Sequence, residues 1–184
     1  MQTTLVMTLI GPDRTGLVEA VASIVASHDG NWLESRMCRL GGEFAGILRV
    51  ELPADQRGDF LDAVQRISGL HVIVGGGEPA VSRKDARKAT LEIMGQDRPG
   101  IVREISAALA RAGVNVEEFS SDVTSGAMSG EPLFIAQGNV QLPKGCDAGA
   151  LEKELEKIAA DLMVDVSLAE GIESKGPLKR GANG

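Results

Sequence analysis

The sequence predicts an α+β fold made of two βαββαβ halves in tandem, and three observations support this prediction. Residues 9–18 read LIGPDRTGLV and residues 93–102 read IMGQDRPGIV, so the chain carries an internal repeat with an offset of 84 positions. Apolar residues alternate with a period of two in the segments expected to be strands. They recur with a period of 3.6 in the segments expected to be helices.

The first half begins with a β-prone segment, residues 3–10, which ends at the breaker pair Gly11-Pro12. After Gly16 the apolar residues form one stripe with helical spacing, which predicts an amphipathic helix over residues 16–28. The remaining elements of this half are strands at 31–40 and 43–52 joined by a Gly-Gly turn, a helix at 55–68 and a strand at 70–74.

The second half repeats this order after a linker rich in glycine and charge. We expect the two domains to cover residues 1–76 and 89–170, with the linker at 77–88 and a flexible tail at 171–184. The predicted elements of the second half are strands at 89–94, 114–124, 132–142 and 164–168, and helices at 100–112 and 148–163.

A four-stranded antiparallel sheet with both helices on one face, the ferredoxin-like arrangement, satisfies the amphipathic pattern of each half. The first strand is apolar on both faces, because Leu5 and Met7 alternate with Val6 and Ile10. We therefore predict that the open face of the sheet is covered by the sister domain or by a second chain. A homo-oligomer, such as a dimer, is expected.

The composition narrows the classes of function. The net charge of −7 argues against a primary role in direct nucleic-acid binding, since lysine and arginine supply most of that affinity. The order βαββαβ also occurs in RNA-recognition modules, but the basic and aromatic pattern of those modules is missing here. Direct RNA or DNA binding is therefore the least favoured binding hypothesis.

The sequence contains no pattern typical of catalysis or of a metal site. Its two histidines and two cysteines show no zinc-binding spacing, and no serine or cysteine lies in a nucleophile motif. We expect no catalytic residues, no metal and no cofactor. Unpaired Cys38 and Cys146, the lack of a signal segment and the lack of a stretch of ~20 apolar residues lead us to expect a cytoplasmic protein without membrane contact.

The repeated loop Gly-x-Asp-Arg-x-Gly is the candidate functional site, because packing alone gives no reason to repeat an Asp-Arg pair in a connection. Amide N–H groups at the start of the following helix, near Gly16 and Gly100, have no intrahelical partner and suit a carboxylate. Asp13 or Asp97 could accept a charge-assisted hydrogen bond from an ammonium group. Such a loop would select an α-amino acid.

Two further features of the loops are relevant to this hypothesis. Asn31 and Asn115, at the start of the second strand of each half, could add an amide contact from beside the loop. Thr15 adds a hydroxyl to the first loop, whereas Pro99 removes an N–H from the second. The two loops therefore need not be equivalent.

A purely structural interpretation of the loop stays open. Aspartate is a preferred N-cap residue and stabilises a helix by ~1 kcal/mol without any ligand. Arg14 and Arg98 could be solvated or could pair with a nearby carboxylate.

Two loops of this kind in matching βαββαβ context, GPDRTGLV at 11–18 and GQDRPGIV at 95–102, make the chain resemble tandem ACT-domain proteins over about residues 3–170. A free-standing pair is similar to the glycine cleavage system transcriptional repressor group. The resemblance implies that small amino acids bind at these turns, often at a seam between two ACT units. The candidate ligand-binding residues are Asp13, Arg14, Thr15, Gly16, Leu17, Asn31, Asp97, Arg98, Pro99, Gly100, Ile101 and Asn115.

We therefore expect a non-catalytic regulatory protein that senses a small amino acid and controls a partner protein. By resemblance, the partner would be a transcriptional regulator of amino-acid (glycine) metabolism, with DNA contacted only indirectly. The alternative is a regulatory subunit that acts in trans on a metabolic enzyme.

Overall fold

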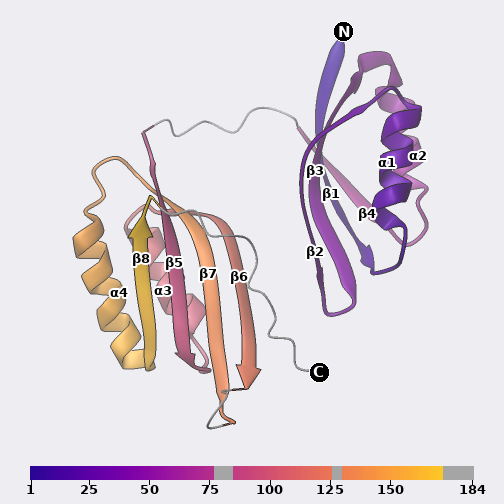
Figure 1. Ribbon diagram of the computed structural model, residues 1–184. Helices are drawn as coiled ribbons and strands as arrows, with labels where there is room; N and C mark the ends of the chain where they lie inside the picture. Colours follow the sequence, from indigo (N-terminus) through magenta and orange to yellow (C-terminus); the bar gives the residue numbers. More distant parts are fainter. Residues whose placement is uncertain (77–84, 126–129, 172–184) are drawn as a thin grey trace. The chain divides into compact units, whose positions relative to one another are not determined.

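The chain folds into two compact units, Met1–Val81 and Ser82–Gly184, each with its own hydrophobic core (Figure 1). The computed structural model describes residues 1–76, 85–125 and 130–171. Each unit contains a four-stranded antiparallel sheet and two α-helices in the order βαββαβ. The predicted α+β fold of two ferredoxin-like repeats is therefore confirmed.

In the first unit the strands are ordered β2-β3-β1-β4, so β2 and β4 form the edges of the sheet. The helix predicted at 55–68 is shorter than expected, because its first turn is a 3₁₀ turn and Gly69, at φ 73°, turns the chain toward the last strand. The elements are β1 (Gln2–Pro12), α1 (Leu17–Ser27), β2 (Asn31–Leu40), β3 (Glu43–Pro53), the 3₁₀ turn (Ala54–Gln56), α2 (Arg57–Gln65) and β4 (His71–Gly76).

The second unit has the equivalent strand order, β6-β7-β5-β8. The linker expected at 77–88 lies outside the described residues up to residue 84, and Arg87 already begins a strand. Apart from Gly171, the tail expected at 171–184 also lies outside them. The elements are β5 (Arg87–Gln96), α3 (Ile101–Arg111), β6 (Asn115–Ser125), β7 (Pro132–Leu142), α4 (Ala148–Leu162) and β8 (Val164–Glu170).

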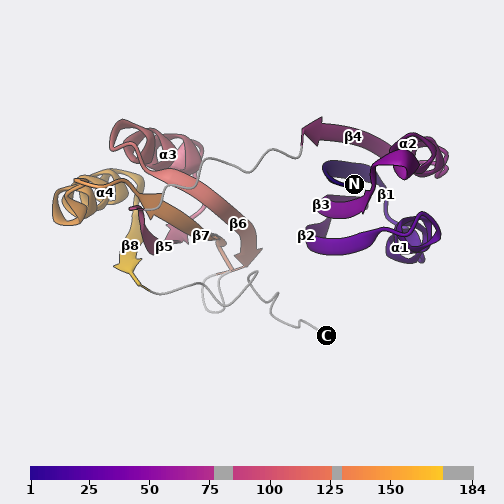
Figure 2. The ribbon, with the colours of Figure 1, turned by 90° about the horizontal axis from the view of Figure 1, so that it is seen from above.

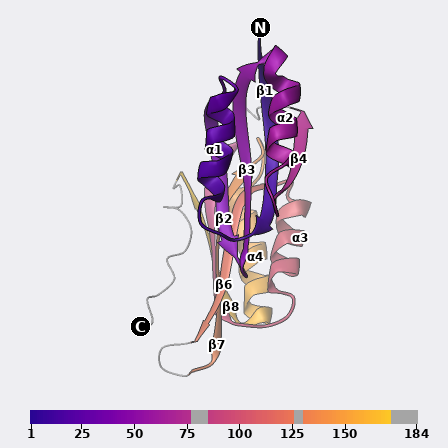
Figure 3. The same ribbon diagram turned by 90° about the vertical axis from the view of Figure 1, so that its right-hand side faces the viewer.

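Both helices of each unit cover one face of its sheet, as predicted. Seen from above, α1 and α2 form one layer against the first sheet, and α3 and α4 form the corresponding layer against the second (Figure 2). The same layer of α1 and α2 is visible along the strands in Figure 3. Between sheet and helices lie the side chains that solvent does not reach, such as Met7, Phe60 and Leu48 in the first unit and Ile93, Ile105 and Leu155 in the second.

The open faces of both sheets mix apolar and polar side chains. On the first sheet Ile10, Ile47 and Ile73 are 43%, 53% and 66% exposed, and Arg49 lies 3.4 Å from Glu34. On the second sheet Met94 is 50% exposed, and Gln137 Nε2 donates to Glu92 Oε1 at 3.1 Å. The prediction that a further chain or domain covers the open face stays a prediction, and the three exposed isoleucines of the first unit support it most.

The first glycine of each repeated loop allows close packing of two backbone segments. A Cβ on Gly11 would lie 2.2 Å from the carbonyl oxygen of Gly69, in the turn before β4. A Cβ on Gly95 would lie 2.6 Å from the Cα of Val164, at the start of β8. The end of the first strand therefore presses against the turn before the last strand in both units.

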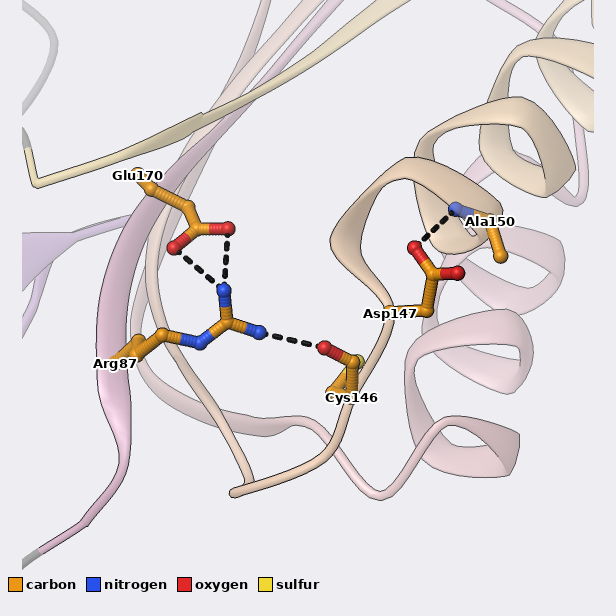
Figure 4. A network of polar contacts seen from close by, with 5 residues as sticks. All are labelled: Arg87, Cys146, Asp147, Ala150 and Glu170. Atoms are coloured by element: carbon orange, nitrogen blue, oxygen red, sulfur yellow. Dashed lines mark hydrogen bonds and ion pairs between the residues drawn. The ribbon is translucent and has the colours of Figure 1, made fainter.

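A polar network holds the start of β5 to the rest of the second unit (Figure 4). Arg87 Nη1 donates to both carboxylate oxygens of Glu170, at 2.8 and 2.9 Å, and its Nη2 donates to the Cys146 carbonyl at 2.5 Å. The next residue, Asp147, caps α4 by accepting a 3.0 Å hydrogen bond from the Ala150 N–H. One arginine thus joins the first strand, the last strand and the turn before α4.

Replacing Gly11 by alanine should destabilise the first unit by about 1–3 kcal/mol, because the new Cβ overlaps a backbone carbonyl. Trp32 is the single tryptophan of the chain and lies in this unit, so its fluorescence during a urea titration measures the free energy of unfolding of the first unit. Gly58→Ala is the matched control: this helical glycine has open space around its Cβ position, and alanine there should be neutral or stabilising by up to about 1 kcal/mol. Equal stability of the Gly11→Ala protein and the wild type would contradict the packing argument.

Arg87→Met should destabilise the second unit by no more than about 1 kcal/mol, since Arg87 and Glu170 are 45% and 38% exposed and water screens their attraction. The loss should be visible in the far-UV circular dichroism transition but not in Trp32 fluorescence. Lys153→Met, an exposed cation on α4, removes the same charge and should change neither transition. If the Arg87 variant lost more than about 3 kcal/mol of unfolding free energy, the network would stabilise the second unit more than exposed ion pairs do, which would contradict this prediction.

Candidate functional site

The repeated loop joins the first strand to the first helix in each unit and is tied down by its backbone. The N–H of Asp13 donates to the Gly42 carbonyl at 2.8 Å, in the turn between β2 and β3. The N–H of Asp97 donates to the Pro132 carbonyl at 3.0 Å, at the start of β7. Both loops therefore lie against the neighbouring hairpin, at the end of the sheet where β1 and β5 finish.

The last glycine of the motif, not the aspartate, caps the helix. Gly16 and Gly100 are the N-cap residues, with left-handed φ values of 89° and 101°, and no side chain caps either helix. The first backbone bonds run from the Ala20 N–H to the Gly16 carbonyl and from the Glu104 N–H to the Gly100 carbonyl. The interpretation that aspartate caps these helices is therefore wrong, because it lies three residues too early.

The uncapped helix starts leave N–H groups available for an anion. Those of residues 17–19 and 101–103 precede the ladder of intrahelical bonds. Together with the helix dipole, such groups attract a carboxylate or a similar anion. Leu17 and Ile101 contribute only backbone to this surface, because their side chains are 4% and 2% exposed and belong to the cores.

The loop arginines have a structural partner in each unit. Arg14 Nη2 donates to the Ser68 carbonyl at 2.7 Å, in the connection between α2 and β4. Arg98 Nη2 contacts Met163 Sδ, in the equivalent connection between α4 and β8, and Gln96 Oε1, each at 3.0 Å. Across the described ranges neither arginine pairs with a carboxylate. The repetition of arginine is thus explained by anchoring of the loop.

The two aspartates differ in their surroundings. Asp13 Oδ2 lies 2.7 Å from Arg39 Nε, near the end of β2, and the Asp13 side chain is 31% exposed. Asp97 is exposed, and its carboxylate has no hydrogen-bond or ion-pair partner in the described part of the chain. Asp97 can accept a hydrogen bond from a ligand without competition, whereas a ligand at Asp13 must share the carboxylate with the Arg39 guanidinium or displace it.

An open hollow of about 520 Å³ lies beside the first loop. Its volume is in the range of small-molecule sites and far exceeds that of a small amino acid. Opposite charges and an apolar wall meet there, which suits a zwitterion with a small side chain. The lining residues are Asp13, Arg14, Gly16, Leu17, Val18, Glu19, Ala22 and Phe44.

Asn31 and Asn115 do not lie beside the loop of their own unit. Asn31 pairs with Glu51 of β3, and Glu51 pairs with Thr4 of β1. Thr4 lies eight residues before Pro12, which is roughly 26 Å along the strand. Asn115 is level with Lys88, at the equivalent far end of β5. The expectation of an amide contact within one unit is therefore wrong, because the second strand starts at the end of the sheet opposite to the loop.

Two further candidate residues lie in the loops themselves, as expected. Thr15 and Pro99 are exposed within the loops. Sequence reasoning missed Arg39, Phe44 and Glu19. Arg39 lies opposite Phe44, which lies opposite Gly11, so its place near the loop depends on the pairing of β1 with β3. The repeat gives no signal there, because the equivalent of Arg39 is Val123.

Residues 1–76, 85–125 and 130–171 contain neither a cluster suited to a metal ion nor a helix able to span a membrane. No group of three or more histidine, cysteine or acidic side chains is placed to hold a metal ion. In the same ranges no helix has both the length and the apolar character needed to cross a bilayer.

Comparison with known proteins gives concordant matches. The sequence profile of the ACT domain matches residues 3–69 and, separately, residues 89–136. A UPF0237 protein of Methanopyrus kandleri is 36% identical over 80 residues, which cover 43% of this chain and 82% of that protein.

Two solved structures share the fold over nearly the whole chain. An unknown protein from Galdieria sulphuraria superposes with a TM-score of 0.81 and 26% identity, covering 94% of this chain and all of that one. A candidate glycine cleavage system transcriptional repressor gives a TM-score of 0.60 at 19% identity, covering 92% and 98% of the two chains. Two βαββαβ units, two matching first-turn loops and two profile matches show that this chain belongs to the ACT-domain family, with one ACT domain in each half.

Proposed function

We propose that this protein is a non-catalytic regulator that binds a small amino acid at the β1–α1 and β5–α3 loops and thereby controls a partner protein. The observation that carries the proposal is the uncapped helix start next to an aspartate, present twice. The N–H groups bind the α-carboxylate, and the aspartate accepts hydrogen bonds from the α-ammonium. A molecule that lacks either group forfeits one of the two interactions.

A seam between two ACT domains completes the site in this proposal. β2 is an edge strand, and antiparallel pairing of two such edges sets the start of one strand beside the end of the other. Asn31 of a second copy would then lie level with Leu40 and close to the Asp13 loop, which reaches β2 through Arg39. The asparagine that lies far from its own loop would thus contact the ligand of a neighbour.

Ligand binding at such a seam changes how tightly two domains pair, because the ligand contacts both of them. That change would expose or hide the surface read by the partner. The candidate glycine cleavage repressor with the same fold makes a transcription factor of glycine metabolism the first partner to test. A metabolic enzyme regulated in trans is the second candidate, since ACT domains are also found attached to enzymes such as formyltetrahydrofolate deformylases.

Titration calorimetry of the full chain with glycine, L-serine and the branched-chain amino acids should give saturable heat with at least one of them. Changing Asp13 and Asp97 together to asparagine should weaken that binding about ten- to hundredfold, because a charge-assisted hydrogen bond is lost at each loop. Asp55→Asn with Asp161→Asn removes two exposed carboxylates elsewhere and should leave binding unchanged. The proposed function would be refuted if none of these amino acids gave heat of binding, or if the loop variant bound as tightly as the wild type.

Replacing Asn31 and Asn115 together by alanine should weaken amino-acid binding about tenfold while the fold of each unit is kept, because both side chains are exposed. The same calorimetric titration measures the effect, and sedimentation velocity with and without amino acid reports the pairing of chains. Gln65→Ala, an exposed amide at the end of α2, is the control and should bind as the wild type does. Unchanged affinity in the asparagine variant would exclude the seam while leaving the loops as the site.

A further inference from the structure

The two loops share their backbone but differ in one charged neighbour, and the strand register makes the comparison direct. Arg39 lies opposite Phe44, which lies opposite Gly11 of the first loop motif. Val123 lies opposite Phe134, which lies opposite Gly95 of the second. Arg39 and Val123 therefore occupy the same place in their domains, and the second domain has no cation there.

Arg39 occupies the group that an α-ammonium would use at the first loop. Its Nε is 2.7 Å from Asp13 Oδ2, and its side chain is 70% exposed. An incoming ammonium must share Asp13 with the guanidinium or displace it. At the second loop Asp97 has no partner in the described part of the chain. The apolar side chain of Val123 cannot compete with an ammonium group for the Asp97 carboxylate.

The other charged groups near the first loop do not take over this role. Arg14 is already engaged with the Ser68 carbonyl. The Glu19 carboxylate accepts a 2.7 Å hydrogen bond from Ser23 Oγ within α1. Arg39 is thus the group that decides how available the Asp13 carboxylate is.

We infer that Arg39 is a specificity-determining residue that makes the two sites unequal: it weakens ammonium recognition at the first loop, so the second loop is the tighter site for an α-amino acid. The first loop retains its N–H groups and gains a guanidinium, and therefore tolerates a carboxylate that lacks the ammonium group. This inference rests on the proposed function and deepens it. An exposed ion pair of this kind changes the affinity by roughly two- to fivefold.

The test is a site-resolved titration of the ¹⁵N-labelled full chain, read at the Gly16 and Gly100 amides. One probe is an equimolar mixture of glycine, L-serine and L-valine. The other is the matching mixture without ammonium groups: acetate, 3-hydroxypropanoate and 3-methylbutanoate. The proteins compared are the wild type, Arg39→Val, which copies the second domain, and Val123→Arg, which copies the first.

With the amino acids, the wild-type Gly100 amide should reach its half-shift at a concentration roughly two- to fivefold lower than the Gly16 amide does. Arg39→Val should lower the Gly16 midpoint by the same factor and leave Gly100 alone, whereas Val123→Arg should raise the Gly100 midpoint. With the ammonium-free acids, Arg39→Val should give no gain at Gly16. Arg36→Val removes another exposed arginine from β2, one without a carboxylate partner in the described residues, and should shift neither midpoint.

Three results would overturn the inference while leaving the proposed function in place: a Gly16 midpoint at or below that of Gly100 in the wild type, no change in the Arg39→Val protein, or an equal gain for the ammonium-free acids. The last result would mean that Arg39 acts on access to the loop and not on the ammonium. An absence of shifts at both amides in every protein would overturn the proposed function and the inference together.

Discussion

The left-handed glycine at the start of the first helix is the constraint on which the site of each domain depends. Gly16 and Gly100 have positive φ angles that an L-residue rarely adopts, and they carry no side chain to cap the helix. The N–H groups of the first turn therefore remain available to an outside acceptor. The rest of the motif supports this geometry: Gly11 and Gly95 allow the close approach of the turn before the last strand, and the loop arginines anchor to that turn.

The separate roles of the glycines, arginines and aspartates explain why the loop is repeated although it is not part of the core. Arginine and glycine are explained by packing and anchoring, whereas the aspartates are not: one pairs with Arg39 and the other has no partner in the described residues. An exposed carboxylate without a structural role, beside uncapped N–H groups, is the combination that a zwitterionic ligand would use. Duplication gives the chain two loops with uncapped N–H groups and an aspartate, and only the first of these aspartates pairs with an arginine in the described residues.

The fold was accessible from the sequence because its signals are local. Hydrophobic periodicity predicted every helix and strand, and the breaker pair at Gly11-Pro12 set the end of the first strand near its observed position. The loop was accessible because the repeat singled it out. Two features were missed for non-local reasons: the role of Arg39 depends on where a hairpin meets the loop, and the distance between Asn31 and the loop depends on the direction of β2 in the sheet.

The central claim is that an amino acid binds with its carboxylate on the helix N–H groups and its ammonium at the loop aspartate. A crystal structure of the full chain soaked with mixed amino acids tests this most directly, at residues 11–17 and 95–101. The account predicts a carboxylate within hydrogen-bond distance of the N–H groups of residues 101–103, with an ammonium on Asp97. Bare loops at saturating amino acid, or a ligand bound elsewhere on the domains, would contradict it.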